Sequence, residues 1–561
     1  MSEPRRGMPA WLFHPSFWVG VLLLVGFLVR VASANAYWKW FDSEFPQTWQ
    51  VSKLDLSQNG MQYALQADPG TWNSPHFQGW DDRPYFRPPL ASYYFVGLFR
   101  LFHFNRLAVS ATQALLATVA YLFAYLLVAQ ILGRRIGLLA LVLLVLHPVL
   151  MFEDTSFEDS VLGMLFVSAA LLAAFWASRG RAARWLLPGL AVGLAMLARP
   201  NLGVVAAGLA ALAYWQARKQ RGKRVAALVA PILFLIMPAA WHNHETSGRW
   251  ILICDITGQN LYWGNGLFDD HRQSVQGYWD IREVDFGSPG MLLVNGLKAR
   301  SGKSATDDAF LAGAIDFVRA HPGKAALGLL RKAWRHVSNY EIPRDRDFNW
   351  LRGHNRWWQL PLLPFSLVLG FALLGIAGLE RRQVFLLGLP WLAIFVSEVL
   401  FFNTSRYRAM ALPFVIPLAL RGGALFFSQV RDWRRYRAVS MSAALLIALF
   451  LLGQYAVGEK EHVGEASVDA FKAAMLESYA DEAGNWRWIS EERFRRRLAE
   501  ARRLDPDNLD AFSVEQKVLI SGGNSDRAMQ NIRERRARCR PGEWLCEDVC
   551  NYVEMDAGAT H

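Results

Sequence analysis

Apolar residues along this chain fall into blocks of about 16–25 residues that alternate with short charged segments. A helix bonds every backbone group within its own segment, so each apolar block predicts a helix that crosses a membrane. The eleven blocks predict an all-α polytopic membrane protein and exclude a soluble cytosolic enzyme. The predicted spans cover residues 15–34, 107–131, 136–152, 160–178, 185–198, 201–217, 225–241, 360–379, 383–402, 409–428 and 438–457.

Three stretches are too polar to cross a membrane, and all three fall on the same predicted side. Two of them, residues 35–106 and 242–359, are outer loops of a predicted transmembrane domain that covers residues 1–457. The tail, residues 458–561, predicts a small helical outer domain, because residues 493–503 have the composition of a charged, exposed helix. The Leu-Asp-Pro-Asp-Asn turn that follows resembles the end of a tetratricopeptide helix, although no clear second repeat is found.

The distribution of charge predicts the orientation in the membrane. Apolar residues make up 53% of the chain and charged residues 19%, and the formal net charge is +12. Basic clusters occupy every second junction between spans. This predicts that the clusters and the N-terminus lie on the cytoplasmic side of a bacterial inner membrane, and that the tail lies on the outer side. The first block lacks a small-residue cleavage site and predicts an uncleaved span. Because loops hold the excess charge, nucleic-acid binding is not expected. The clusters are at residues 5–6, 134–135, 179–184, 218–224, 381–382 and 431–437.

Four cysteines are present, and their spacing decides between metal and disulfide chemistry. Cys254 falls in the second outer loop, and Cys539, Cys546 and Cys550 fall in the tail. These spacings do not form the paired Cys-x-x-Cys framework of a zinc site. In an oxidising compartment, one disulfide among the last three cysteines is expected, and its pairing stays open.

Ionisable residues gather at the predicted outer ends of the spans in four groups. Asp55 and Arg87 belong to the first outer loop. Residues 153–159 hold four carboxylates, and Asp159 begins the next apolar block. A charge costs about 2.5–3.5 kcal/mol at the centre of a span and less near its edge, so such residues are candidates for function. The other two groups are Arg199-Pro200-Asn201 and Ser405-Arg406-Tyr407-Arg408.

Each group also has a structural interpretation: a solvated Asp55, an acidic outer loop, a snorkelling Arg199 and an ordinary interfacial anchor. Together, the groups join acids and phosphate-binding cations at one membrane face. Guanidinium forks stabilise phosphate oxygens and a carboxylate accepts a proton, which suits transfer of a group from a lipid phosphate. Walker, GxSxG, HExxH and kinase motifs are missing from the sequence. No cofactor is required by these residues, and a divalent metal at the 153–159 carboxylates stays open.

Three short motifs follow one another in the first outer loop, and together with the span count they resemble a known family. Residues 15–430 resemble the GT-C superfamily of membrane glycosyltransferases, within it the branch of aminoarabinose transferases and protein O-mannosyltransferases. The resemblance implies a polyprenyl-phosphate-sugar donor, membrane lipid as surroundings, and an envelope glycan, lipid or protein as acceptor. The motifs are Asn59-Gly60-Met61-Gln62-Tyr63-Ala64, Gly70-Thr71-Trp72 and Pro84-Tyr85-Phe86-Arg87-Pro88-Pro89-Leu90.

The resemblance also implies roles for matching residues. Arg87 takes the place of the basic residue of the family's first loop. Asp159, or Glu158 one residue earlier, takes the place of the second acid, from the loop between spans three and four. Tyr407 takes the place of a tyrosine that precedes Leu-Pro, and His242 begins a polar triplet after span seven.

One departure affects the catalytic assignment. The first-loop aspartate of the family is replaced by Asn59, whose amide cannot act as a base. The carboxylate is then Asp55, one helical turn earlier, or Asp81 or Asp82, or the chain binds its ligands without catalysis. Asn59 would in any case be placed to position an acceptor.

The leading hypothesis is an inverting glycosyltransferase in which Asp55 is the base and Asp159 or Glu158 orients the acceptor. A catalytically inactive lipid-phosphate-binding relative or scaffold is the second hypothesis. A transporter or flippase is the third, disfavoured because the spans do not form two matching halves with broken helices. The predicted substrate- and phosphate-binding residues are Arg87, Tyr63, Arg199, His242, Arg406, Tyr407 and Arg408.

Overall fold

The computed structural model of the protein describes most of the predicted spans and part of the loops and tail. The described residues are 15–44, 84–85, 87–216, 220–265, 306–342, 348–431, 436–455, 478–480, 486–488, 491–504, 512, 515–516, 519–520, 524–538 and 550.

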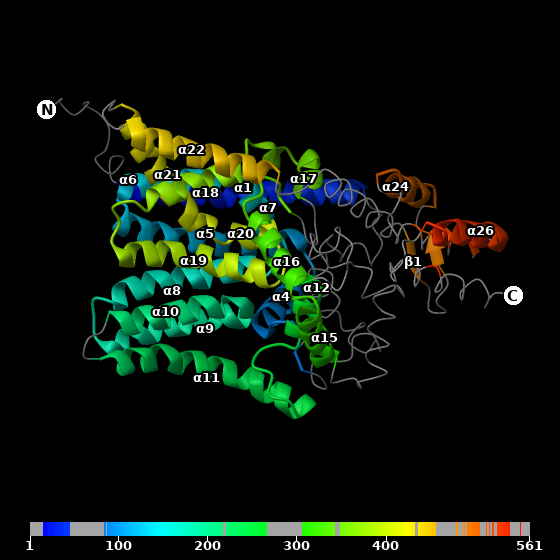
Figure 1. Ribbon diagram of the computed structural model, residues 1–561, viewed down its shortest axis with the longest axis horizontal. Coiled ribbons are helices and arrows are strands. Elements are labelled where there is room, and N and C mark those ends of the chain that lie inside the picture. The colour runs from blue at the N-terminus through cyan, green and yellow to red at the C-terminus, as the bar shows by residue number, and fades with distance from the viewer. Residues whose placement is uncertain are drawn as a thin grey trace.

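A bundle of apolar helices forms the body of the molecule (Figure 1). Among the described residues, six helices are long and apolar enough to cross a membrane, and four shorter apolar helices accompany them. Each of the eleven predicted spans overlaps a helix, which confirms an all-α, multi-pass membrane protein. The helices of the bundle are α1 (Pro15–Glu44), α5 (Arg106–Ile131), α6 (Arg134–Leu146), α8 (Ser160–Ala177), α9 (Leu186–Ala198), α10 (Gly203–Trp215), α11 (Arg221–Ser247), α18 (Phe365–Gly375), α19 (Arg381–Leu400), α21 (Leu412–Val430) and α22 (Tyr436–Gln454).

Two predicted spans have different bounds in the structure. The first was expected to end at residue 34, but α1 continues to Glu44 because its last turns pack Tyr37, Trp38 and Phe41 into an aromatic core. The span predicted over residues 136–152 is broken at His147, which is extended with φ −72° and ψ 117°. The following Pro148 has no N–H and disfavours helical geometry in the residue before it, so a second helix begins there.

Short elements gather at one end of the bundle, which we call the head end (Figure 1). The tail helices and strands lie beyond this same end, and the N-terminal end of α1 lies at the opposite end. Two three-residue strands pair antiparallel, with Tyr479 opposite Arg487. The head-end elements are α4 (Pro89–Leu101), α7 (Pro148–Glu153), α12 (Thr257–Gly264), α15 (Thr306–Ala320), α16 (Pro322–Arg335), α17 (Phe348–Leu351), η8 (Arg352–His354), η9 (Arg356–Gln359) and α20 (Ser405–Ala409). The tail elements are β1 (Ser478–Ala480), β2 (Trp486–Trp488), α24 (Glu491–Leu504) and α26 (Ser525–Arg536). Two 3-10 turns, η5 (Ala182–Trp185) and η6 (Pro200–Leu202), complete the described elements of the body.

Small residues allow close approach of the helices, as is common where lipid offers no hydrophobic drive for association. At the contact between α18 and α21, a Cβ on Gly375 would lie 2.0 Å from the carbonyl oxygen of Leu418. A Cβ on Gly422 would lie 1.8 Å from the carbonyl oxygen of Phe371. The two glycines therefore set the distance between these helices.

A buried ion pair joins α1 to the rest of the bundle. Arg30 is completely buried and its Nε lies 2.7 Å from Asp154 Oδ2. The hydroxyl of Tyr121 donates to the same carboxylate oxygen. The guanidinium also donates to the carbonyl oxygens of Leu144 at 3.0 Å and Val145 at 3.1 Å. Because all of its bonding capacity faces protein, this arginine holds the bundle together.

The tail contains a small helical unit with its own apolar contacts. Phe494, Ala501 and Ile532 are buried there, and Asn531 donates to Gln516 Oε1 at 2.8 Å. Cys550 is buried, and its Sγ lies 3.9 Å from the carbonyl oxygen of Ile532. The other two tail cysteines lie outside the described residues.

Candidate functional site

Five of the residues predicted for the site meet at the head end of the bundle. Glu158 and Asp159 lie in the turn between α7 and α8. Arg406 forms an ion pair with Glu158, and both side chains are at most 6% exposed. Arg199 Nη1 lies 3.2 Å from Asp159 Oδ1. Two adjacent carboxylates thus face two guanidinium groups that come from distant parts of the sequence.

Tyr407 lies beneath one of these guanidinium groups. The Cζ of Arg199 is 4.4 Å from the centroid of the Tyr407 ring, and the Cζ of Arg406 is 5.8 Å from it. An aromatic face attracts a cation, most strongly where water is excluded. Arg199 is 3% exposed and Tyr407 is 8% exposed, so the contact is shielded from water. The tyrosine ring therefore helps to fix the position of the Arg199 guanidinium group.

Asp159 keeps hydrogen-bonding capacity despite its neighbour. The Nη1 of Arg199 donates to Ser160 Oγ at 2.9 Å, and among the described residues Asp159 Oδ1 accepts no hydrogen bond. The side chain of Asp159 is 13% exposed, compared with 4% for Glu158. Asp159 is thus the more exposed carboxylate of the pair.

The backbone explains how Arg199 reaches this position. Pro200 disfavours a helical residue before it, so α9 ends at Ala198 and Arg199 is extended with φ −150° and ψ 102°. Gly163 on α8 leaves room for the side chain, because a Cβ there would lie 3.1 Å from Arg199 Cδ. The tight junction between the fifth and sixth predicted spans therefore places the Arg199 side chain next to Asp159.

Polar residues of α5 clamp the backbone of the carboxylate turn. Gln113 Nε2 donates to the carbonyl oxygens of Ser156 and Glu158, each at 2.9 Å. Ser110 Oγ donates to the carbonyl oxygen of Thr155 at 2.9 Å. Neither residue is among those predicted from the sequence. The signal that could have found them is a polar side chain within an apolar span, which is a functional candidate by default.

The Pro84–Leu90 motif lies against the start of the second loop. Asn243 accepts a hydrogen bond from the Tyr85 backbone N–H at 2.7 Å and donates to the carbonyl oxygens of Ile251 and Ile253 at 2.9 and 3.1 Å. The ring of His242 lies 4.3 Å from that of Tyr85. His242, which was expected to bind substrate, thus packs against the first loop.

Arg87 belongs to the same neighbourhood as Asp159 and the second loop. Burial raises the pKa of the Cys254 thiol to about 12. That value includes the positive charge of Arg87, which lowers the pKa, and the negative charges of Asp307, Asp255 and Asp159, which raise it. The thiol therefore stays protonated among charged groups and is a poor nucleophile.

Arg408 has different partners from the other two arginines. Its guanidinium donates to the carbonyl oxygens of Ser338 at 2.6 Å and Tyr340 at 3.0 Å, and to Glu341 Oε2 at 3.1 Å. Its Cζ also lies 4.6 Å from the centroid of the Phe365 ring. With these partners, Arg408 anchors residues 338–341 of the second loop, and the phosphate binding expected for it stays a prediction.

The remaining predictions fall outside the described part of the chain. Asp55, Asn59, Tyr63 and the alternative acids Asp81 and Asp82 all lie there. Within the described ranges, no three His, Cys, Asp or Glu side chains lie together as possible metal ligands, so we assign no metal site.

The sequence of this region matches a known family. Residues 86–242 match the family model described as dolichyl-phosphate-mannose-protein mannosyltransferase. The matched segment includes Glu158, Asp159 and Arg199, and it confirms the resemblance to GT-C membrane glycosyltransferases that use lipid-linked sugars. No curated protein matches the sequence of the chain.

Solved structures of the oligosaccharyltransferase of Archaeoglobus fulgidus are similar in outline. The apo form has 15% sequence identity and a TM-score of 0.42, over 81% of this chain and 58% of that chain. The complex of this enzyme, AglB, with an inhibitory peptide and a dolichol-phosphate has 13% identity and a TM-score of 0.40, again over 81% and 58%. The chain thus spans less than two thirds of that enzyme, and both scores are too low to establish a shared fold.

Proposed function

We propose that the protein is an inner-membrane glycosyltransferase that moves a sugar from a polyprenyl-phosphate donor to an envelope glycan, lipid or protein. The observation that carries this proposal is the convergence of Glu158 and Asp159 with Arg199 and Arg406 at the head end. The matched family segment contains three of these residues. In this proposal the head end faces outward, in agreement with the basic clusters at the opposite junctions.

The chemistry needs a base for the acceptor and positive charge for the leaving group. The acceptor oxygen or nitrogen attacks the anomeric carbon from the face opposite the phosphate, and the bond between that carbon and the phosphate oxygen breaks with inversion. The proton of the acceptor passes to a carboxylate. The departing polyprenyl phosphate gains one negative charge, which guanidinium groups at a water-poor site stabilise strongly.

The residues divide between these tasks. Asp55 is the proposed base, and Asp159 or Glu158 orients the acceptor. Arg199 and Arg406 bind the phosphate, with Tyr407 beneath Arg199 and Arg87 nearby. In the absence of donor, the two carboxylates hold the guanidinium groups in place, so a phosphate meets cations that are already oriented.

A transfer assay tests the proposal. Purified protein in lipid receives a panel of polyprenyl-phosphate sugars with envelope extract as acceptor, and mass spectrometry follows the mass of one sugar on the product. We expect transfer by the wild type and a loss of about 100-fold in Asp159→Asn, since misplacing a reactant by about 1 Å costs about 10²-fold. Asp55→Asn is expected to abolish transfer while donor binding remains.

The matched control is Glu245→Gln, an exposed carboxylate at the same end of the bundle that is outside the proposed site. It should transfer at the wild-type rate. Equal activity of Asp159→Asn and wild type would remove Asp159 from the mechanism, and donor binding without transfer to any acceptor would count against an enzyme.

The amide at Asn59 supports a second candidate, an inactive relative that binds lipid phosphate and presents its tail to an envelope partner. The test is Asn59→Asp. Transfer that appears only in this variant would favour the inactive relative, whereas transfer by the natural chain excludes it.

A further inference from the structure

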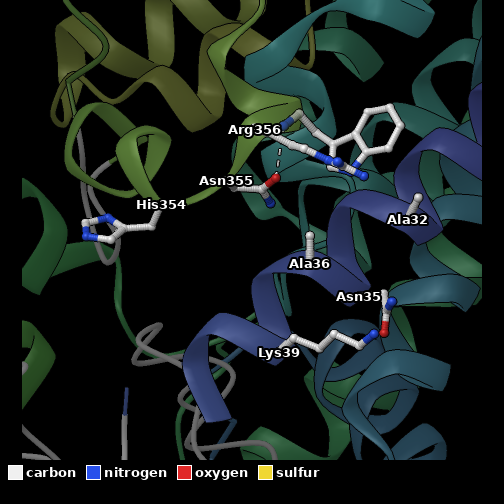
Figure 2. A pocket seen from close by; sticks show the side chains of 8 residues that line it. Ala32, Asn35, Ala36, Lys39, His354, Asn355 and Arg356 are labelled. Carbon is white, nitrogen blue, oxygen red and sulfur yellow. Dashed lines mark hydrogen bonds between the residues drawn. The ribbon is translucent and has the colours of Figure 1, made fainter. Parts of the chain in front are cut away.

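A hollow at the head end lies between α1 and the η8–η9 segment and shares no residue with the candidate site (Figure 2). Its volume is about 460 Å³. Three basic side chains, Lys39, His354 and Arg356, belong to its lining, and none of its eight lining residues is acidic. The others are Ala32, Asn35, Ala36, Asn355 and Trp357.

Hydrogen bonds and aromatic packing hold the wall of the hollow in place. Asn355 is 2% exposed, its Nδ2 donates to the carbonyl oxygen of Ser33 on α1 at 3.0 Å, and its Oδ1 accepts from the Trp357 N–H at 3.1 Å (Figure 2). The next residue, Trp358, is 1% exposed and packs 5.5 Å from the Tyr37 ring. The segment that carries His354 and Arg356 is thus fixed to α1.

The floor of the hollow continues a lipid-facing stripe of α1. Leu24 and Leu28 are 59% and 53% exposed on this helix, and only 28% of its most apolar 18-residue stretch is buried in the protein. Residues four apart share a helix face, so Leu28 is followed on the same face by Ala32, Ala36 and then Lys39. Lys39 lies about 16 Å beyond Leu28, at 1.5 Å per residue. Because alanine side chains are small, Ala32 and Ala36 leave space on the helix surface between Leu28 and Lys39.

The aromatic surroundings place the hollow at the membrane interface. The rings of Trp40 and His354 are tilted by 37° with centroids 4.7 Å apart, and the Cζ of Arg356 lies 5.4 Å from the centroid of the Trp357 ring. Tryptophans concentrate at the depth of lipid headgroups, where basic side chains also attract anionic lipids.

We propose that this hollow binds the phosphate headgroup of an anionic glycerophospholipid, with an acyl chain lying along Leu24 and Leu28. Lys39 and Arg356 donate charge-assisted hydrogen bonds to the phosphate oxygens, and Asn35 faces the polar part of the headgroup. Free phosphate has the same head chemistry, but it would not use the apolar stripe that leads into the hollow.

Native mass spectrometry of the full chain in detergent tests the proposal, with phosphatidylglycerol and phosphatidylcholine as probes. We expect phosphatidylglycerol to bind preferentially to the wild type. The double variant Lys39→Gln/Arg356→Gln should lose at least about tenfold in affinity, which corresponds to about 1.4 kcal/mol. Both side chains are exposed, so the variant should fold, and an unchanged melting temperature checks this.

Arg319→Gln is the matched control, because Arg319 is 77% exposed on the same side and lies outside the hollow. It should bind phosphatidylglycerol as the wild type does. Equal binding by the double variant, or equal binding of the two lipids, would overturn the proposal. If millimolar inorganic phosphate displaces bound phosphatidylglycerol, the hollow is a free-anion site. If polyprenyl phosphate displaces it at a lower concentration than added phosphatidylglycerol does, the hollow is a donor site. Either result also overturns the proposal.

Discussion

The guanidinium of Arg199 lies 4.4 Å above the ring of Tyr407, and the same group contacts Asp159 at 3.2 Å. The arginine is therefore held between an aromatic face and a carboxylate. Its Nη1 also donates to Ser160 Oγ at 2.9 Å, and we propose that its other N–H groups bind the phosphate of the donor.

The ring of Tyr407, rather than its hydroxyl, should support donor binding. We expect Tyr407→Phe to keep the KM for the polyprenyl-phosphate donor near the wild-type value. Tyr407→Leu should raise it about 5- to 30-fold, because a desolvated cation–π contact contributes roughly 1–2 kcal/mol. Steady-state kinetics with varied donor measures both values. If Tyr407→Phe is as impaired as Tyr407→Leu, the hydroxyl acts directly on the substrate.

The Glu158–Arg406 pair should stabilise the fold as a unit. Removal of one partner takes the opposite charge away from a buried ion, so Glu158→Gln and Arg406→Met should each lower the free energy of unfolding by about 3–5 kcal/mol. The double variant should lose less than the sum of the two. Chemical denaturation in detergent measures these energies. Arg319→Met, which breaks an exposed pair, should change stability by less than about 1 kcal/mol, and additive losses at 158 and 406 would contradict the coupling.

The space beside Gly163 should control the position of Arg199. A single Cβ there would lie 3.1 Å from Arg199 Cδ and 3.1 Å from Met410 Sδ. Gly163→Val adds two further carbons, so we expect a loss of transfer activity that exceeds the loss of thermal stability. Gly388→Val is the control, since a Cβ at Gly388 on α19 meets nothing within 4 Å. Equal activity of the two variants would show that Arg199 does not need this space.

Stability should depend on pH through Asp255. Burial, together with the negative charges of Asp307 and Asp308, raises its pKa to about 6, against the opposing positive charge of Arg249. A carboxyl group with a raised pKa contributes stability that is complete below its ordinary value of 3.8 and is lost as the pH rises through about 6.

Asp255→Asn removes this titration. The melting temperature of the variant relative to the wild type should therefore be lowest near pH 4 and should rise through pH 6 to a plateau. Asp316→Asn, at a side chain that is 75% exposed, should show a flat difference. A flat difference for Asp255→Asn as well would contradict the role of burial.

The structure confirms the helical spans predicted from the sequence, because a long apolar run in lipid has few alternatives to a helix. The differences have local causes that stand in the sequence. Pro148 divides the third predicted span, and aromatic residues after residue 34 extend α1. The sequence also predicted that the acids and arginines lie near the ends of the spans, where charged residues at a membrane edge are unusual.

The tertiary structure alone decided which charges meet. In sequence, Arg199, Arg406 and Arg408 are equivalent basic residues at span ends, yet two of them face the carboxylate turn and the third anchors the second loop. Asp154 is one of the four carboxylates of residues 153–159, but it pairs with Arg30 inside the bundle. Helical periodicity determines which residues share a face of one helix. The rotation and packing of several helices determine which faces meet, and this depends on contacts between residues far apart in the chain.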